Sequence, residues 1–192
     1  MEILKRRIIL ASKSPRRSHL LREAGFSNFE IRALDVDESW PAEMPVDEVA
    51  PFLAEKKAIA SKGFLEHPEE VLIAADSVVI LGERIFGKPA DYDDAVSILR
   101  ALSGKVHRVI TGVCLLSLSK KRVFADVAKV CFLPLSDEEI RYYLDHYAPF
   151  DKAGAYAIQE WVGLCKIEKI EGTYSNIMGL PMERLYSELM KF

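Results

Sequence analysis

The segment 71–81 is almost continuously apolar, and one carboxylate, Asp76, interrupts it. Such a run of valine, isoleucine and leucine, closed by Gly82, predicts a buried β-strand. An unpaired carboxylate inside a strand of this kind is energetically costly, so Asp76 needs a partner. Two interpretations stay open from the residues alone. Asp76 is a metal ligand or general base, or it is paired with a buried arginine or with backbone amides.

The remaining patterns alternate between strands and helices. Residues 106–118 and 122–133 predict an antiparallel hairpin, whereas the other strands are separated by helices, so we expect an α/β fold with a mixed sheet. No linker, repeat or low-complexity segment divides the 192 residues, which predicts a single domain, 1–192. The expected strands are 7–11, 71–81, 106–118, 122–133 and 162–170, and the expected helices are 15–24, 47–62, 92–102, 137–146 and a C-terminal one that Pro181 opens.

Composition excludes several classes of protein. With 49% hydrophobic and 29% charged residues, the chain is too apolar for disorder and has no apolar run long enough to span a membrane. A net charge of −3 argues against an extended nucleic-acid footprint, although a single nucleotide is compatible with it. Neither the histidines nor the cysteines have the spacing of a metal site. The three cysteines are widely spaced and odd in number, so we expect buried free thiols in a reducing cytoplasm. The cysteines are Cys114, Cys131 and Cys165.

A polar turn joins the first strand to the first helix. Ser12 and Ser14 precede Pro15, which suits the first helical position with Ser14 as the N-cap. Free backbone N–H groups, two hydroxyls and the adjacent Arg16 and Arg17 make this junction a candidate phosphate site, although it is not a P-loop. The alternative is an ordinary capped helix with two solvated arginines.

Other charged residues stand in less decisive settings. Lys88 lies in a Gly-Lys-Pro turn, and Lys56 falls within the apolar stripe of helix 47–62, with Lys57 at its edge. Each of these lysines also fits a solvated surface. Glu38, in an acidic loop, offers an oxygen ligand to a cation such as Mg²⁺, and a solvated loop is the alternative.

Seven short motifs together resemble the Maf family of nucleoside triphosphate pyrophosphatases, and the match extends over nearly the whole chain. Ile158 and Gln159 resemble the branch of that family that hydrolyses dTTP and UTP. The motifs are LASxSPRR at 10–17, ADSVV at 75–79, GKP at 87–89, LSG at 102–104, TGV at 111–113, DKAGAY at 151–156 and NxMGLP at 176–181.

The resemblance implies a fold and a set of roles. It implies a strongly curved mixed sheet flanked by helices, two lobes around a central cleft, a cytoplasmic enzyme and a homodimer. Asp76 takes the role of proton acceptor and, with Glu38, of ligand to Mg²⁺ or Mn²⁺. The family spacing selects Lys57, whereas the helical stripe favours Lys56. The implied substrate-binding residues are Ser12, Ser14, Arg16, Arg17, Lys57, Ser77, Lys88, Lys152 and Gln159.

The sequence departs from the family pattern near the expected base pocket. Ser77 stands where threonine is usual, and Ala157 and Glu160-Trp161 replace glycines that flank Ile158-Gln159. We therefore expect an altered pocket shape but an intact set of phosphate-binding residues.

These observations lead to the hypothesis of an enzyme of nucleotide metabolism. It hydrolyses a nucleoside triphosphate between the α and β phosphates, with Asp76 activating water with the help of the metal. Gln159 offers one donor and one acceptor, which match the edge of thymine or uracil and not that of cytosine. The alternatives are a non-catalytic nucleotide-sensing regulator of division or septum formation, and a pyrophosphatase for a modified nucleotide.

Overall fold

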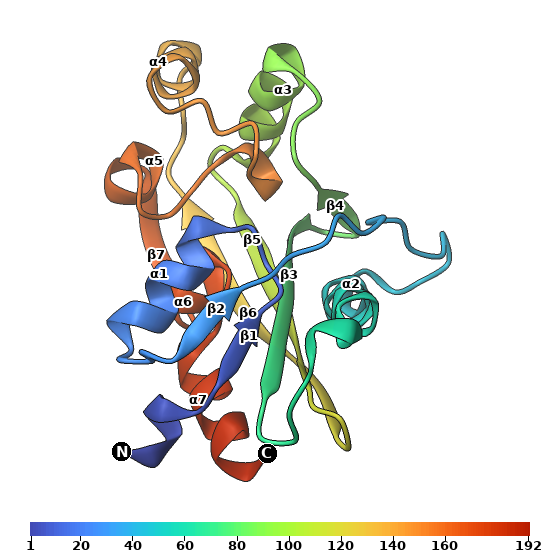
Figure 1. Ribbon diagram of the computed structural model, residues 1–192. Helices are drawn as coiled ribbons and strands as arrows, with labels where there is room; N and C mark the ends of the chain where they lie inside the picture. Colours follow the sequence, from blue (N-terminus) through green and yellow to red (C-terminus); the bar gives the residue numbers. More distant parts are fainter. The chain divides into compact units, whose positions relative to one another are not determined.

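The computed structural model describes all residues, 1–192 (Figure 1). In chain order, with η for a 3-10 helix, its elements are η1 (Glu2–Lys5), β1 (Ile8–Leu10), α1 (Pro15–Glu23), β2 (Phe29–Ile31), α2 (Val46–Ala60), η2 (Lys62–Phe64), β3 (Val71–Leu81), β4 (Arg84–Phe86), α3 (Tyr92–Leu102), β5 (Val106–Leu116), β6 (Lys121–Phe132), α4 (Asp137–Tyr147), η3 (Ala153–Ala155), α5 (Trp161–Cys165), β7 (Ile167–Glu171), α6 (Tyr174–Met178) and α7 (Met182–Lys191).

The sheet has seven strands in the order β2-β1-β3-β5-β6-β7, with β4 paired to β3. Strand β1 pairs in parallel with both β2 and β3, whereas β3–β4 and β6–β7 are antiparallel. The prediction of an α/β fold with a mixed sheet flanked by helices is therefore confirmed. No helix is both long enough and apolar enough to cross a membrane.

The chain divides into two compact units, so the single domain 1–192 stays a prediction. Strands β3, β5 and β6 each run from one unit into the other. The first unit comprises Met1–Asp76, Thr111–Asp126 and Gly179–Phe192, and the second comprises Ser77–Ile110 and Val127–Met178.

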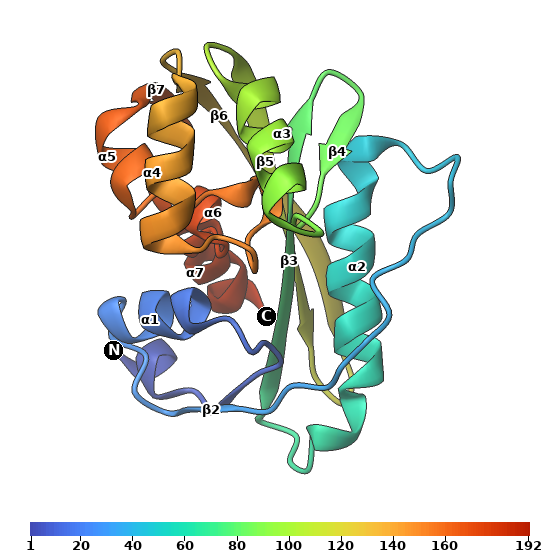
Figure 2. The same cartoon turned by 90° about the horizontal axis from the view of Figure 1, so that it is seen from above.

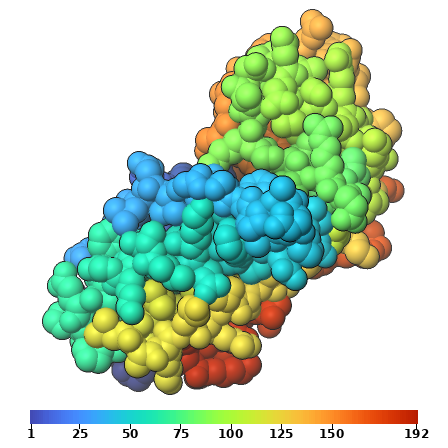
Figure 3. Space-filling model, turned by 90° about the vertical axis from the view of Figure 1, so that its right-hand side faces the viewer, coloured from blue at the N-terminus to red at the C-terminus, as the bar shows by residue number.

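In the first unit, strand β1 is buried completely between its two neighbours. Helix α2 lies along β3 (Figure 2), and its buried alanines, Ala54 and Ala58, join one apolar cluster with the strand residue Leu72. A second cluster packs α1 and α7 around Ile8 and Leu185. The acidic loop that precedes α2 lies on the surface (Figure 3).

In the second unit, α3 and α4 lie side by side and bury one apolar cluster (Figures 1 and 2). The starts of both helices are as predicted. The Asp91 side chain accepts from the backbone N–H of Asp94 at 2.8 Å, and Ser136 and Glu139 form a capping box. These caps satisfy helix N–H groups that have no partner within the helix.

Three sequence predictions are wrong in detail. Ser14 occupies the N-cap position of α1, but its side chain makes no capping bond. Residues 162–170 do not form one strand, because the apolar stretch Trp161–Cys165 is the helix α5 and only Ile167–Glu171 is extended. A short apolar run suits a buried helix as well as a strand. Of the three free cysteines, only Cys114 is fully buried, and Cys165 is exposed.

His107, in β5, is buried in the second unit among aromatic rings. Its ring is edge-on to that of Phe132, with centroids 4.8 Å apart, and its Nε2 lies 2.7 Å from the Tyr156 hydroxyl. Burial lowers the pKa of His107 to about 4. The neutral imidazole is therefore the form that this core accepts.

This buried histidine makes the fold sensitive to acid. Below the ordinary pKa of about 6.5, His107 is protonated in the unfolded chain but stays neutral in the folded chain until the pH nears 4. The free energy of unfolding therefore falls as the pH drops from 6.5 towards 4. We expect a loss of about 2 kcal/mol at pH 5 from this residue. Urea unfolding of the wild type and of His107→Gln at pH 7.5 and 5.0 measures it. His107→Gln should lose less stability on acidification, whereas the exposed-site control His19→Gln should match the wild type; equal losses in all three would contradict the prediction.

Candidate functional site

The turn between β1 and α1 is built around Ser12 and Arg17. The buried Ser12 hydroxyl accepts from the Ser14 backbone N–H at 3.3 Å and from Arg17 Nη1 at 3.0 Å. Arg17 Nε donates to the carbonyl of Gly179 at 2.7 Å. The guanidinium is thus fixed from two sides by segments that are distant in sequence. Gly179 lies in the NxMGLP motif, and this carbonyl contact gives that motif a structural role in the site.

Arg17 shares its surroundings with two carboxylates. Burial lowers the pKa of Arg17, the carboxylate of Asp76 raises it, the neighbouring Arg16 lowers it, and Glu38 raises it. These side chains are therefore close enough to interact electrostatically. The turn therefore brings Arg16 and Arg17 together, and the Arg17 guanidinium lies within reach of the charges of Asp76 and Glu38.

Lys57 joins the two predicted acidic residues. Its ammonium contacts Asp76 Oδ1 and lies 2.7 Å from Glu38 Oε1. The side chains of Lys57 and Asp76 are 17% and 13% exposed, whereas that of Glu38 is 44% exposed. The partner of the carboxylate in the apolar strand is therefore a lysine.

The neighbouring Lys56 faces elsewhere. It binds Asp37 Oδ2 at 2.9 Å and the carbonyl of Ser39 at 3.1 Å. The helical stripe favours Lys56 and the family spacing selects Lys57; the structure brings Lys57 to Asp76.

Glu38 and Asp76 supply two carboxylates for a metal ion. No group of three or more His, Cys, Asp or Glu side chains is arranged to hold a metal ion. Mg²⁺ typically takes one or two carboxylates and completes its coordination with water and substrate phosphates. The pair therefore fits a hard divalent cation that binds together with a phosphate ligand.

In the second unit, two predicted lysine-bearing segments are tied together. The backbone N–H of Gly154 donates to the carbonyl of Gly87 at 3.0 Å, so the turn that carries Lys88 lies against the segment that carries Lys152. Gly154 has a φ of +72°, and a Cβ there would lie 2.9 Å from a methyl of Val79. Both the backbone conformation and the packing therefore require glycine.

The lysines differ in their exposure. Lys88 is exposed, whereas Lys152 is buried, with its ammonium 2.7 Å from Asp151 Oδ1 and 3.5 Å from Glu160 Oε1. Ser77 is half-buried and follows Asp76 directly in β3.

Gln159 carries an unsatisfied polar atom. Its side-chain oxygen is buried and accepts no hydrogen bond from the protein. Buried amide oxygens in folded proteins nearly always have a donor, so this one is suited to a ligand that supplies it. The Tyr143 hydroxyl bonds to the Ala157 N–H and to Glu160, and so holds the segment on both sides of Gln159. No sequence pattern indicates this role, because Glu160 stands out only as a departure from the family and Tyr143 does not stand out at all.

The predicted residues fall into one set in each unit. Asp76 and Ser77, adjacent in β3, stand at the point where the chain passes from the first unit to the second. The first unit holds Ser12, Ser14, Arg16, Arg17, Glu38, Lys57 and Asp76, and the second holds Ser77, Lys88, Lys152 and Gln159.

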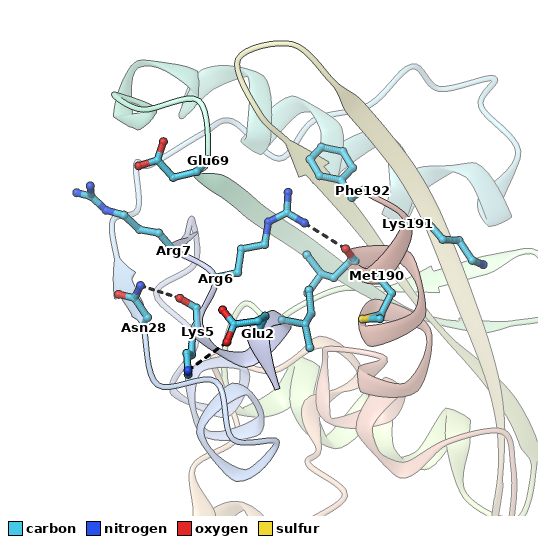
Figure 4. Close-up of a pocket in the computed structure, with 11 residues that line it drawn as sticks. Glu2, Lys5, Arg6, Arg7, Asn28, Glu69, Met190, Lys191 and Phe192 are labelled. Atoms are coloured by element: carbon cyan, nitrogen blue, oxygen red, sulfur yellow. Dashed lines mark hydrogen bonds and ion pairs between the residues drawn. The ribbon is translucent and has the colours of Figure 1, made fainter.

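A cavity of about 660 Å³ in the first unit is lined by none of these residues (Figure 4). It lies between η1 and the end of α7. Arg6 crosses it, donating to the carbonyl of Leu189 at 3.1 Å and lying over the ring of Phe192. The candidate site is therefore separate from this cavity.

Comparison with known proteins gives consistent results. The family model described as "Maf-like protein" matches residues 7–192. The dTTP/UTP pyrophosphatase of Phocaeicola vulgatus is 47% identical over 188 residues, which cover 97% of this chain and 96% of that protein. The dTTP/UTP pyrophosphatase of Bacteroides thetaiotaomicron is also 47% identical, with the same coverage. That of Parabacteroides distasonis is 46% identical over the full length of both chains.

Proposed function

The chain belongs to the Maf family, and we propose that it hydrolyses dTTP and UTP to the monophosphate and pyrophosphate. The observation that carries the proposal is the contact of Lys57 with Asp76 beside Glu38. It gives one cluster both a carboxylate able to take a proton and a cation able to bind phosphate. The similarity to named pyrophosphatases over the whole chain supports the same assignment.

Asp76 is the proposed proton acceptor. Its carboxylate sits in an otherwise apolar strand with the Lys57 ammonium as its partner. Phosphate oxygens of a bound triphosphate compete for that ammonium, which leaves Asp76 Oδ1 available to accept a proton from the attacking water. Glu38 and Asp76 would hold the divalent cation, which supplies charge neutralisation and makes bound water more acidic.

The cations bind the triphosphate and stabilise the charge that develops on it. Arg17 is pre-organised by Ser12 and Gly179, so its guanidinium pays little entropy on binding. Arg16 and the N–H groups at the start of α1 add donors to the same turn. We assign Lys88 and Lys152, together with Ser77 and Ser14, to the same substrate.

Gln159 is the proposed base-recognition residue. Its unpartnered oxygen accepts the N3–H of uracil or thymine, and its amide N–H₂ donates to the 4-carbonyl. Cytosine presents the reverse pattern, so two polar groups would be left unpaired. We further propose that the enzyme works as one domain in the cytoplasm, where its three free thiols stay reduced, and as a homodimer.

One substrate panel tests the function. Pyrophosphate release is measured from the common ribo- and deoxyribonucleoside triphosphates and from base-modified ones, with Mg²⁺ or Mn²⁺, by adding inorganic pyrophosphatase and a phosphate dye. We expect dTTP and UTP to be hydrolysed fastest. Nucleotide binding without pyrophosphate release would favour the non-catalytic regulator, and a preference for a modified base would favour the modified-nucleotide enzyme.

Replacing Gln159 with methionine should relax base choice. The side chain keeps its length but loses its donor and acceptor, so we expect kcat/KM for UTP to fall about tenfold or more while that for CTP changes little. The UTP:CTP ratio of kcat/KM, from the same assay, is the measurement. An unchanged ratio in a folded variant would exclude Gln159 from base recognition.

A further inference from the structure

A buried tyrosine in α4 organises the segment between Lys152 and Gln159. The Tyr143 hydroxyl accepts from the backbone N–H of Ala157 at 3.0 Å and donates to Glu160 Oε2. Burial, reinforced by the Glu160 carboxylate, raises the pKa of Tyr143 well above its usual value. The phenol therefore stays a donor, and one hydroxyl fixes the segment on both sides of Gln159.

Glu160 divides its two oxygens between different partners. Oε2 is held by Tyr143, and Oε1 lies 3.5 Å from the Lys152 ammonium. The side chains of Glu160 and Lys152 are only 17% and 11% exposed, so solvent screens their charges poorly. At 3.5 Å the ion pair is looser than that of Lys152 with Asp151, at 2.7 Å.

The bond to Tyr143 restrains Glu160 from closing on Lys152. The hydrogen bond from the phenol draws part of the negative charge of Glu160 away from the Lys152 ammonium. It also holds the carboxylate at its present distance from that ammonium. If the phenol were absent, Glu160 would turn both oxygens to Lys152 and compete with phosphate for it. Tyr143 also accepts the N–H of Ala157, two residues before Gln159, and so sets the backbone from which that side chain projects.

We propose that Tyr143 is a positioning residue of the nucleotide site: it holds the Glu160 carboxylate back from Lys152, which stays available for the triphosphate, and it fixes the backbone from which Gln159 reaches the base. The inference rests on the proposed function, since it takes Lys152 and Gln159 as substrate-binding residues. It adds Tyr143, which acts through Lys152 and Gln159, and Glu160, the carboxylate that Tyr143 restrains; neither is expected to touch the substrate.

Two single variants should shift KM in opposite directions. Tyr143→Phe frees Glu160 to pair fully with Lys152, so we expect KM for UTP to rise about three- to tenfold. Glu160→Gln keeps an oxygen for Tyr143 but removes the charge beside Lys152, so KM should fall or kcat/KM rise by about two- to fivefold. In the double variant the rise in KM should disappear, because it requires the Glu160 charge. A purely structural role would raise KM in both single variants.

Base choice provides a second readout. Tyr143→Phe leaves the Ala157 N–H without its acceptor, so the UTP:CTP ratio of kcat/KM should fall about threefold or more. Glu160→Gln retains that bond, and its ratio should stay that of the wild type. Tyr147→Phe is the matched control, since Tyr147 is on the same helix with its ring stacked at 5.2 Å on that of Tyr143 and should change neither KM nor the ratio.

The outcomes separate this inference from the proposed function. A wild type that releases no pyrophosphate from UTP or dTTP defeats the function itself. An active wild type with Tyr143→Phe folded and unchanged in both KM and base ratio overturns the positioning role alone. Should Tyr143→Phe fail to fold, as judged by circular dichroism, Glu160→Gln decides: a lower KM supports the proposal, and an unchanged or higher KM overturns it.

Discussion

Asp76→Asn should lower kcat for dTTP and UTP at least about a hundredfold while KM changes by no more than about threefold. The asparagine side chain has nearly the same shape, so it still fits between the apolar residues of β3, but its amide cannot take a proton from water. Lys57 loses Asp76, one of its two carboxylate partners, and keeps Glu38 at 2.7 Å, so the ammonium that binds phosphate stays in place. Pyrophosphate release and calorimetric titration with a non-hydrolysable dTTP analogue measure turnover and affinity separately.

Asp37→Asn is the matched control for this substitution. Asp37 is exposed, and its partners are Ser39 and, at 2.9 Å, Lys56, the neighbour of Lys57 on α2. We expect its kinetics to match those of the wild type. A large drop in affinity for Asp76→Asn with unchanged kcat would identify Asp76 as a binding residue and leave the proton acceptor to be found elsewhere.

The need for a partner at Asp76 was visible in the sequence, but the identity of that partner was not. An apolar strand with one carboxylate implies a nearby cation or donor wherever it occurs. The helical stripe pointed to Lys56, because periodicity ranks residues by how apolar their own helix face is. The packing of α2 against the sheet decides which lysine reaches Asp76, and it brings Lys57 there. Helical periodicity contains no information on this packing, whereas the family spacing reflects it.

The error at 162–170 has a related cause. The backbone N–H of Leu164 bonds to the carbonyl of Glu160 at 3.1 Å, and a Cβ at Gly163 would overlap the carbonyl of Ile158. The chain therefore turns tightly after Gln159 and enters the short helix α5. A run of apolar residues in the sequence fits a strand as well as it fits such a helix. The hydroxyl of Tyr143 escaped notice for the same reason, since a tyrosine on the buried face of a helix is first interpreted as core.

Gly112 allows α2 to pack closely against β5. A Cβ on this residue of β5 would lie 2.3 Å from backbone atoms of both Ala50 and Pro51, so strand and helix backbones are in direct contact. The TGV motif at 111–113 thus has a packing reason. Because Lys57 is two turns further along the same helix, the distance between Lys57 and Asp76 depends on this contact.

Gly112→Ala should therefore lower both stability and turnover. The added methyl meets rigid backbone and cannot be absorbed by a rotamer change, so we expect the free energy of unfolding to fall by about 3 kcal/mol or more. Gly63→Ala, where a Cβ meets nothing within 4 Å, should cost less than about 1 kcal/mol. Urea unfolding of both variants measures this difference, and equal stabilities would show that α2 moves aside freely.

The same variant links the packing contact to the site. At a temperature where Gly112→Ala is still folded, α2 must stand further from β5, and its Lys57 must shift relative to Asp76. We expect KM for dTTP to rise about threefold or more in the folded variant, with Gly63→Ala unchanged. Wild-type kinetics in folded Gly112→Ala would mean that Lys57 reaches the phosphates from a displaced helix as well as from the native one. In that case the long side chain, and not the seating of α2, sets the position of its charge.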